Sequence, residues 1–212
     1  MLHIVETHNR SSFTSLLDEM HVLRARVFKE RLQWDVNVVA GREIDEFDSA
    51  DPLYILSVNE RTQRLQGSVR LLPTTGPNML RDVFSVLLPN ELVVESPTIW
   101  ESSRFCIDPD LANPSEGLIN RITTELLCGL VEVGLQAGLS HIVSVYDARM
   151  ARIFRASNCP AEVIGTPTRI GRVLTYAGLF EITQDLWNSV ASTGGVFQSV
   201  VLRENLQAAS AA

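Results

Sequence analysis

The amino-acid sequence predicts an α/β fold with a mixed sheet, on two observations. Apolar residues recur at intervals of three and four in three segments, and short β-rich runs lie between these segments. Two of the runs, at 53–58 and 67–73, are joined by a polar turn, which predicts an antiparallel hairpin. Because strands that alternate with helices pair in parallel, the hairpin makes the predicted sheet a mixed one.

The predicted elements follow in order along the chain. A helix at 12–34 precedes the hairpin, and the run W-E-S-S-R-F-C-I at 100–107 alternates as a strand does. This alternation places Trp100, Ser102, Arg104 and Cys106 on one face and Glu101, Ser103, Phe105 and Ile107 on the other. The remaining elements are a helix at 115–138 ended by Gly138, a strand at 141–146, a helix at 148–156, a strand and turn at 163–171, and mixed signals at 172–190.

Composition limits the classes of function. The 212 residues are 45% hydrophobic and 20% charged, which predicts one globular domain over 1–212 with a frayed tail at 205–212. The formal net charge of −7 argues against nucleic acid as a partner. No run approaches the ~20 apolar residues that span a bilayer, so we expect no membrane insertion. The N-terminal stretch contains Glu6 and does not resemble a signal peptide, and we expect a cytoplasmic protein.

Cysteine, histidine and lysine usage adds to these limits. Cys106, Cys128 and Cys159 are widely spaced and the histidines are scattered, so neither a disulfide framework nor a zinc site is predicted. Lys29 is the single lysine among 18 basic residues. This bias fits either codon usage in a GC-rich genome or the bidentate capture of carboxylate or phosphate by arginine.

Six charged residues lie within or beside apolar runs. Such positions seldom carry unpaired charge, so these side chains should pair with one another or face a cleft. Each one alone could be an ordinary edge or surface charge, but three of each sign together predict a buried ionic cluster. They are Arg24, Asp45, Asp48, Arg70, Glu101 and Arg104.

Five short motifs occur in a fixed order between residues 20 and 110. They are Arg24-x-x-x-Phe28, then Trp34, then E-x-D-x-F-D at 43–48, R-L-L-P-T-T-G-P at 70–77, and W-E-x-S-R-F at 100–105. In this order and spacing they resemble the LuxI-type acyl-homoserine lactone synthases. The resemblance implies a GNAT-like three-layer α-β-α fold, with a twisted mixed sheet that is splayed open to form an acyl-binding cleft.

The resemblance also implies a reaction. A fatty-acyl thioester, carried by acyl carrier protein or coenzyme A, acylates the amine of S-adenosylmethionine. The carboxylate of the same molecule then attacks its γ-carbon, which closes the lactone and releases 5'-methylthioadenosine. The lactone is a quorum-sensing signal. S-adenosylmethionine is a substrate in this reaction, and no cofactor or metal is implied.

The resemblance assigns roles to residues of the motifs. Glu101 would take the proton of the amine, directly or through a water, and Ser103 would polarise the thioester carbonyl. A structural salt bridge is the alternative for Glu101. Phe28 and Trp34 would face the sulfonium and adenine, with a cation–π attraction of about 0.5–2 kcal/mol. Core packing is the alternative for these two aromatic residues.

The other charged residues divide between ligand and support. The resemblance places Asp45 on the substrate ammonium and Arg104 or Arg24 on the substrate carboxylate, and it counts Arg104 among the catalytic residues. Arg70 and Asp48 would hold the others in place.

The stretch G-R-E-I-D-E-F-D contains the third motif and four acids within six positions. In an extended chain Asp45 shares a face with Glu43 and Phe47, and Asp48 points the other way. We therefore expect Asp45 to face the ligand, Asp48 to face an arginine, and Glu43 and Glu46 to be solvated. No histidine or further carboxylate motif lies nearby, so a metal site is not predicted.

By resemblance, an acyl pocket is expected between the strand that ends near Tyr146 and the helix after it. Phe105, Met150 and Phe154 would form its walls, although each could equally be a core residue. In relatives that prefer 3-oxo chains a threonine aligns with Ser144, and the smaller hydroxyl here leaves that preference open. Relatives often have a smaller residue in place of Tyr146, so we expect Tyr146 to shorten or reshape the pocket.

Arg149, Arg152 and Arg155 are spaced by three and form a basic stripe on the helix at 148–156. The stripe is either a solvated helix face or a dock for acidic acyl carrier protein or for the phosphates of coenzyme A.

Two other functions compete with lactone synthesis. A different GNAT-like N-acyltransferase that uses acyl-coenzyme A usually carries an R/Q-x-x-G-x-G/A loop, and this sequence lacks it. A non-catalytic relative that only binds the ligands would not need the motif residues, all of which are present.

Overall fold

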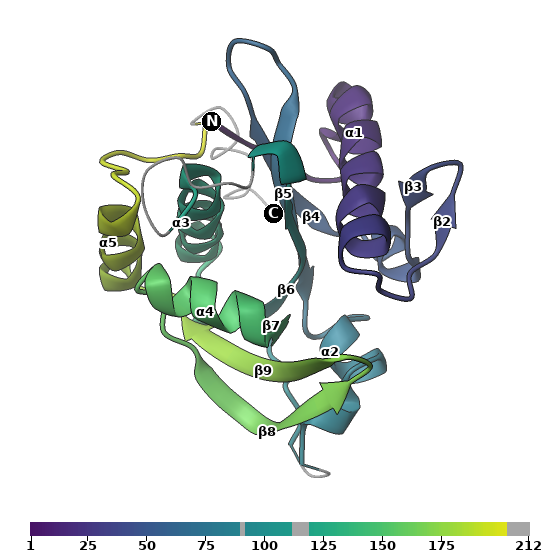
Figure 1. Cartoon of the computed structure of the whole chain (residues 1–212). Coiled ribbons are helices and arrows are strands. Elements are labelled where there is room, and N and C mark those ends of the chain that lie inside the picture. The colour runs from purple at the N-terminus through teal and green to yellow at the C-terminus, as the bar shows by residue number, and fades with distance from the viewer. Residues whose placement is uncertain (90–91, 112–118, 203–212) are drawn as a thin grey trace.

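The computed structural model describes residues 1–89, 92–111 and 119–202 and has a twisted seven-stranded sheet at its centre (Figure 1). Across the sheet the strands are β1 (Leu2–Val5), β4 (Leu53–Val58), β5 (Leu65–Pro73), β6 (Ile99–Ile107), β7 (His141–Asp147), β9 (Val173–Glu181) and β8 (Glu162–Ile170). Neighbours are antiparallel except for β6 and β7, which run parallel. The predicted mixed sheet is therefore confirmed.

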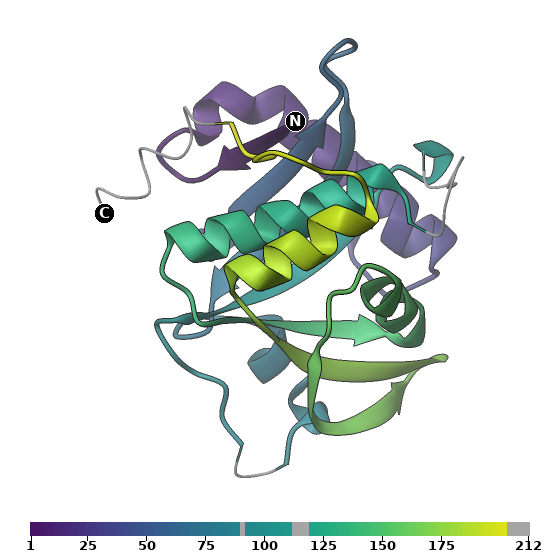
Figure 2. The same ribbon diagram turned by 90° about the vertical axis from the view of Figure 1, so that its left-hand side faces the viewer.

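Helices cover both faces of the sheet and make three layers (Figures 1 and 2). On one face lie α3 (Arg121–Gln136), α4 (Ala148–Ala156) and α5 (Gln184–Thr193). On the other lie α1 (Thr14–Arg24), which continues as a π-helical segment (Ala25–Arg31), and the short α2 (Met79–Asp82). A small hairpin of β2 (Val38–Val39) and β3 (Arg42–Glu43) stands beside α1.

Strand alternation gives each face of the sheet its own core. Ile55 of β4 packs in a cluster with Leu126 of α3, whereas its neighbour Leu56 packs with Met20 and Leu23 of α1. The hairpin of β4 and β5, which was predicted from its polar turn, supplies apolar side chains to both cores.

The two long helices have different bounds from those predicted. The segment predicted as a helix at 12–34 divides into α1 and the π-helical segment, and it ends at Arg31. In the segment predicted at 115–138, α3 begins at Arg121, because the side chain of Asn120 accepts a hydrogen bond from the amide of Ile122 (2.8 Å) and caps the first turn. The predicted start of this helix, 115–118, lies outside the described residues.

The other predicted elements are present, and the strands β1, β2 and β3 and the short helix α2 were not predicted. Gly138 follows α3 with a φ of +67°, as expected for a residue that ends a helix. The segment 172–190, where the sequence showed both strand and helix patterns, contains β9 and most of α5. β1 is too short to give a clear sequence pattern, and the predicted tail at 205–212 lies outside the described residues. No helix in the described part of the chain is long and apolar enough to cross a membrane.

A β-bulge in β6 corrects the predicted alternation of that strand. The register with β5 shifts between the pairs Ser68–Cys106 and Arg70–Ser103, so β6 holds one extra residue, and Arg104 has a φ of +54°. As a result Arg104 lies on the same face as Ser103, toward α1 and α2, while Phe105 packs on the face of α3. The sequence pattern had placed Arg104 and Ser103 on opposite faces.

β6 and β7 pair over four residues and then separate. Their parallel register runs from Ile99–His141 to Ser102–Ser144 and stops there, although both strands continue, β6 beside β5 and β7 beside β9. The sheet is therefore open between the second halves of β6 and β7, and it is splayed as the resemblance implies.

Gly165 in β8 provides a test of how this edge of the sheet is packed. It has a φ of +69°, and a Cβ atom there would lie 2.0 Å from the carbonyl oxygen of Leu87. We expect Gly165→Ala to lower the free energy of unfolding by about 2–5 kcal/mol, from left-handed strain and overpacking together. Gly171→Ala is the matched control, because Gly171 has a φ of +59° and no atom within 4 Å of a built Cβ. It should lose only about 1–2 kcal/mol in urea unfolding; equal losses would contradict the close contact at Leu87.

Candidate active site

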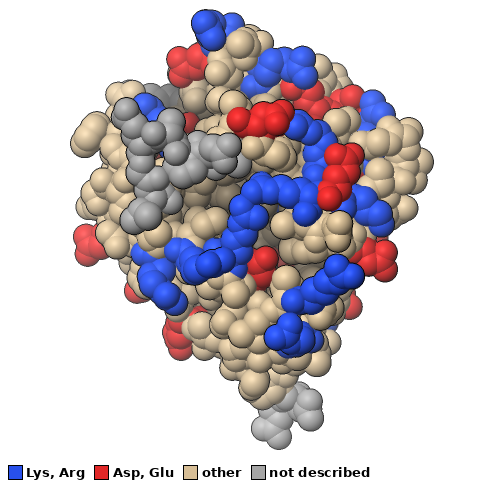
Figure 3. Space-filling view, viewed as in Figure 1, with Lys and Arg blue, Asp and Glu red and all other residues tan. Residues whose placement is uncertain are grey.

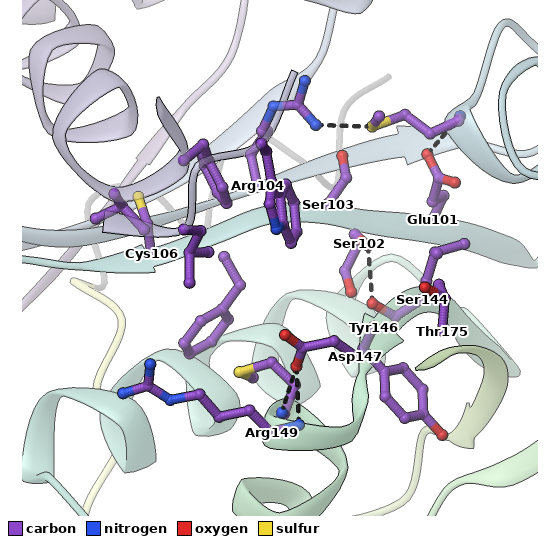
Figure 4. A pocket seen from close by; sticks show the side chains of 18 of the residues that line it. Glu101, Ser102, Ser103, Arg104, Cys106, Ser144, Tyr146, Asp147, Arg149 and Thr175 are labelled. Atoms are coloured by element: carbon purple, nitrogen blue, oxygen red, sulfur yellow. Dashed lines mark hydrogen bonds between the residues drawn. The ribbon is translucent and has the colours of Figure 1, made fainter. Parts of the chain in front are cut away.

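A cleft of about 960 Å³ opens where β6 and β7 separate (Figure 4). The π-helical segment and the loop after it line one side, and α4 and the β8–β9 turn line the other. The ion pairs gather at one end of the cleft, together with the stacked Phe28 and Trp34, and an aromatic cluster of Tyr146, Phe154 and Phe180 lies at the other end.

Three arginines and three carboxylates at the charged end form a closed ring in which the signs alternate. In order round the ring they are Arg24, Glu43, Arg104, Asp45, Arg70 and Asp48, and each neighbouring pair lies within 3.0 Å. The predicted ionic cluster is present, and Glu43 takes the sixth place, which the sequence analysis had given to Glu101.

The ring has a buried side and a side that faces the cleft. Arg24, Arg70 and Asp48 do not line the cleft, and the side chains of Arg24 and Arg70 are 1% and 0% exposed. Asp45 and Arg104 line the cleft, with side chains 16% and 8% exposed. In this structure Arg24 therefore has no surface to offer a ligand, so the contact predicted for Arg104 or Arg24 is left to Arg104.

Two expectations for the stretch 43–48 are wrong. Glu43 is fully buried rather than solvated, because the β2–β3 hairpin lays it beside α1, where its carboxylate meets Arg24 Nε at 2.5 Å. Asp45 and Asp48 do not point to opposite sides, since Asp45 caps a 3-10 turn (Glu46–Ser49) and both carboxylates accept hydrogen bonds from Arg70. Glu46 is exposed, as expected.

The ring controls the ionisation of Asp48. Burial would raise the pKa of this carboxyl, but hydrogen bonds and charges from Arg24, together with the charge of Arg70, outweigh burial and hold the pKa well below its usual range. The hydroxyl of Tyr54 also donates to Asp48 Oδ1 at 2.7 Å. Asp48 therefore remains a carboxylate throughout the neutral range.

Glu101 holds the loop that carries α2. Its two carboxylate oxygens accept the amide hydrogens of Met79 (2.8 Å) and Leu80 (2.6 Å), and the side chain is buried. The motif at 70–77 helps to form this contact. The hydroxyl of Thr74 donates to the backbone carbonyl of Ile99, which turns the chain after β5 back toward β6. Burial raises the pKa of Glu101, although the two amide hydrogen bonds oppose the shift. Glu101 lines the cleft and is a stronger base than an ordinary glutamate.

Ser103 and Arg104 lie next to Glu101 on the cleft surface of β6 (Figure 4). Arg70 Nε donates to the hydroxyl oxygen of Ser103 at 3.1 Å, which leaves the hydroxyl hydrogen for another acceptor. Arg104 reaches the sulfur of Met79 with Nη1 at 3.2 Å. The bulge therefore groups an acid, a hydroxyl and a guanidinium on one surface.

Phe28 and Trp34 stack beside the ring, with centroids 5.2 Å apart. Both line the cleft, but Phe28 is buried and the guanidinium of Arg104 lies over its ring at 5.4 Å. Trp34 is half-buried, so it has more aromatic surface available to a ligand.

The aromatic end contains all five residues predicted for the acyl pocket: Phe105, Ser144, Tyr146, Met150 and Phe154 line the cleft. Tyr146 meets Phe154 edge-on at 5.0 Å and stacks on Tyr176 at 5.6 Å. The hydroxyl of Ser144 donates to the backbone carbonyl of Ser102 at 3.0 Å, at the point where the two strands part. Their predicted role in acyl binding stays a prediction.

The three arginines of the basic stripe on α4 do not all lie at the cleft. Arg149, Arg152 and Arg155 are all exposed, but of the three only Arg149 lines the cleft. On the face seen in Figure 3, Lys and Arg side chains form a band across the middle of the molecule, while Asp and Glu are scattered.

Three contributions to the site could not be assigned from the sequence. Glu43 belongs to the third motif, which was a usable signal, but the acidic surroundings favoured a solvated turn. Met79 contributes its backbone amide and its sulfur, and a methionine in the sequence gives no sign that it will make such contacts. Tyr176 opposes Tyr146 in the β7–β9 register, and strand pairing is needed to see it.

The predicted family is supported by comparison with known proteins. The family model of autoinducer synthases matches residues 7–190. An acyl-homoserine-lactone synthase of Agrobacterium fabrum is 36% identical over 183 residues, which are 86% of each chain. The crystal structure of the AHL synthase LasI is 31% identical, covers 91% of this chain and 94% of its own, and has a TM-score of 0.77.

The fold has a further match at low sequence identity. A structure of the CoA-dependent acyl-homoserine lactone synthase BjaI, with SAM and isopentyl-CoA, is 23% identical and has a TM-score of 0.85 over 100% of this chain and 99% of its own. Fold and site together define an acyltransferase with a GNAT-like three-layer architecture, as predicted. Within that class, the chain belongs to the autoinducer synthase family.

The burial of Glu43 can be tested by a pair of isosteric substitutions. Glu43→Gln removes one negative charge from the ring and leaves Arg24 and Arg104 under-compensated in a buried site. We expect the free energy of unfolding to fall by about 3–5 kcal/mol. Glu46→Gln, in the same stretch but exposed, should change it by less than about 0.5 kcal/mol. Urea unfolding of both variants measures the difference, and similar small losses would show that Glu43 is not part of a buried ring.

Proposed function

We propose that this protein makes an acyl-homoserine lactone from S-adenosylmethionine and an acyl thioester. The observation that carries the proposal is the division of the cleft into a charged end, built by the ring of ion pairs, and an aromatic end. A small charged substrate fits the first end and an acyl chain fits the second. The charged and aromatic ends meet at β6, where Glu101, Ser103 and Arg104 lie.

S-adenosylmethionine takes the charged end in this proposal. Asp45 binds the substrate ammonium and Arg104 binds the carboxylate, since these two ring members line the cleft and are partly exposed. Trp34, with Phe28 behind it, faces the sulfonium and the adenine. Arg70 and Asp48, which do not line the cleft, fix Asp45 and Arg24 in place.

In the first step the amine nitrogen attacks the thioester carbon and the carbon–sulfur bond breaks. The bound ammonium first releases one proton to water and becomes the free amine. Glu101 then accepts the second proton, directly or through a water, as the nitrogen attacks, and passes it to the departing thiolate. The Ser103 hydroxyl, held by Arg70 Nε, donates to the carbonyl oxygen as negative charge develops on it.

In the second step a carboxylate oxygen of the acylated product attacks its γ-carbon. The bond from that carbon to the sulfonium breaks, and the electron pair stays on sulfur, so that neutral 5'-methylthioadenosine leaves. The ring of ion pairs, which has no net charge of its own, holds the carboxylate of the substrate near Arg104. Neither of the two proposed steps uses a metal or a cofactor.

The acyl donor approaches from the side of α4. We assign the exposed arginines Arg149, Arg152 and Arg155 to docking of an acidic acyl carrier protein or of coenzyme A. We also propose a cytoplasmic location, because Cys106, Cys128 and Cys159 are free thiols, as is usual in a reducing compartment.

The reaction is tested with purified protein, S-adenosylmethionine and acyl thioesters of several lengths. Mass spectrometry should find N-acyl-homoserine lactone and 5'-methylthioadenosine in equal amounts. An acylated product without methylthioadenosine would indicate a different N-acyltransferase, and binding of S-adenosylmethionine without turnover would indicate a non-catalytic relative.

The role of Glu101 is separated from a structural one by the pH profile. The base must be ionised, so the wild-type rate should rise with pH through the raised pKa of Glu101. Glu101→Gln should lower kcat by about 10²–10⁴-fold and abolish this rise. A Gln variant that loses activity but keeps the pH dependence would assign Glu101 to holding α2 alone.

Tyr146 is expected to set the length of the acyl chain. Its ring fills the space beside Gly178, where a built Cβ would lie 2.7 Å from the Tyr146 hydroxyl. Tyr146→Val should shift the products toward longer chains, by roughly fourfold in kcat/KM for each methylene that becomes buried, at about 0.8 kcal/mol each. Tyr146→Phe, which keeps the ring, is the control. An unchanged preference in the Val variant would remove Tyr146 from the acyl pocket.

A further inference from the structure

Three exposed arginines from three separate elements line the cleft. Arg31 ends the π-helical segment, Arg149 lies in the first turn of α4, and Arg172 lies in the turn between β8 and β9. All three line the cleft and all three are exposed, which places them at its mouth. The sequence analysis had singled out only Arg149, as part of the stripe on α4.

These arginines differ from those of the ring in having no acidic partner. Each ring arginine has carboxylates within 4 Å, whereas Arg31, Arg149 and Arg172 form no ion pair within the described part of the chain. Burial, together with the charge of Arg149, lowers the pKa of Arg31, so the two guanidinium groups lie close enough to repel each other.

Outside the ring and β6, three acids also line the cleft. The carboxylate of Asp147 accepts the amide hydrogens of Arg149 and Met150 and caps α4. Asp35 and Glu46 are exposed but form no ion pair with the three arginines in the described residues.

Unpaired guanidinium groups around a concave opening are suited to an oxyanion with several oxygens, above all a phosphate. In the proposed reaction S-adenosylmethionine carries no phosphate, so the phosphate must belong to the acyl donor. Acyl carrier protein and coenzyme A both hold the acyl group on a pantetheine arm that ends in a phosphate. Because the thioester must reach β6 inside the cleft while the carrier stays in solvent, the arm passes through the mouth of the cleft, where these arginines lie.

We propose that Arg31, Arg149 and Arg172 form a binding site for the phosphate of the donor's 4'-phosphopantetheine arm. The inference rests on the proposed function and adds two residues, Arg31 and Arg172, to the donor side of the site. The site binds the phosphate that acyl carrier protein and coenzyme A have in common, so it serves donors with either carrier. Arg152 and Arg155, the rest of the stripe on α4, contact the carrier itself.

The test compares donors that carry the same acyl group with and without the phosphate. Arg31→Gln combined with Arg172→Gln should lower kcat/KM for acyl-4'-phosphopantetheine by roughly tenfold or more, through KM, because charge-assisted hydrogen bonds to the phosphate are lost. The same loss is expected with acyl-coenzyme A and with acyl-carrier protein. With acyl-pantetheine, which lacks the phosphate, and in the KM for S-adenosylmethionine, the double variant should match the wild type.

Arg61→Gln is the matched control, because Arg61 is an exposed arginine without an ion pair in the described residues and lies in the β4–β5 turn, away from the cleft. Arg61→Gln should leave kcat/KM unchanged with all four donors. Equal losses with and without the phosphate would overturn the proposal. So would a loss confined to coenzyme A, which would assign the arginines to its nucleotide, or a loss confined to the carrier protein, which would assign them to its acidic surface.

Direct binding separates this inference from the proposed function. Calorimetry with 4'-phosphopantetheine and with pantetheine should show a phosphate-dependent affinity in the wild type that the double variant loses. If the protein forms no lactone with any donor but shows this difference, the proposed function fails and the site stands. If lactone forms and the phosphate makes no difference, the site fails and the proposed function stands.

Discussion

A closed ring of three guanidinium groups and three carboxylates holds the charged end of the cleft together. Burying any one of these charges alone would cost several kcal/mol, and burying one pair is often no better than neutral. In the ring every charge has an opposite charge on each side, so the desolvation of six ions is shared among six contacts. The ring joins α1, the stretch 43–48, β5 and β6, which explains why motifs far apart in the sequence occur together.

The ring closes only because β6 is irregular. An ideal strand would turn Arg104 toward α3, away from Glu43 and Asp45. The bulge places Arg104 in the left-handed region, at a backbone cost of about 1–2 kcal/mol, and turns its side chain toward the ring. The same irregularity lies just beyond Ser102, where β6 leaves β7. One extra residue therefore serves both the charged end of the cleft and the opening that receives the second substrate.

How much of this could be predicted depends on whether a feature is local. The hairpin of β4 and β5, α4 and the stop at Gly138 follow from spacing and turn residues close in sequence. The charged cluster was also predictable, because Arg70 and Arg104 interrupt apolar strands. The burial of Glu43 was not, since a residue among four acids looks solvated until α1 and its arginine are beside it. The bulge at Arg104 and the stacking of Tyr176 on Tyr146 depend on strand register, which a single sequence does not contain.

The charged end and the mouth of the cleft also differ in net charge, and this separates the substrates. The pKa of Asp48 is depressed in the folded protein, so its contribution to stability is present above the ordinary carboxyl pKa, about 3.9, and is lost as pH falls toward the folded value. At neutral pH Asp48 is ionised, and with all six members charged the ring has no net charge. A neutral ring of alternating signs can bind an amino acid's ammonium and carboxylate side by side, but it does not attract a phosphate. The mouth, with three arginines free of acidic partners in the described residues, does the opposite. S-adenosylmethionine is thus drawn to the charged end and the phosphate of the acyl donor to the mouth, and the reacting atoms meet on β6 between these two places.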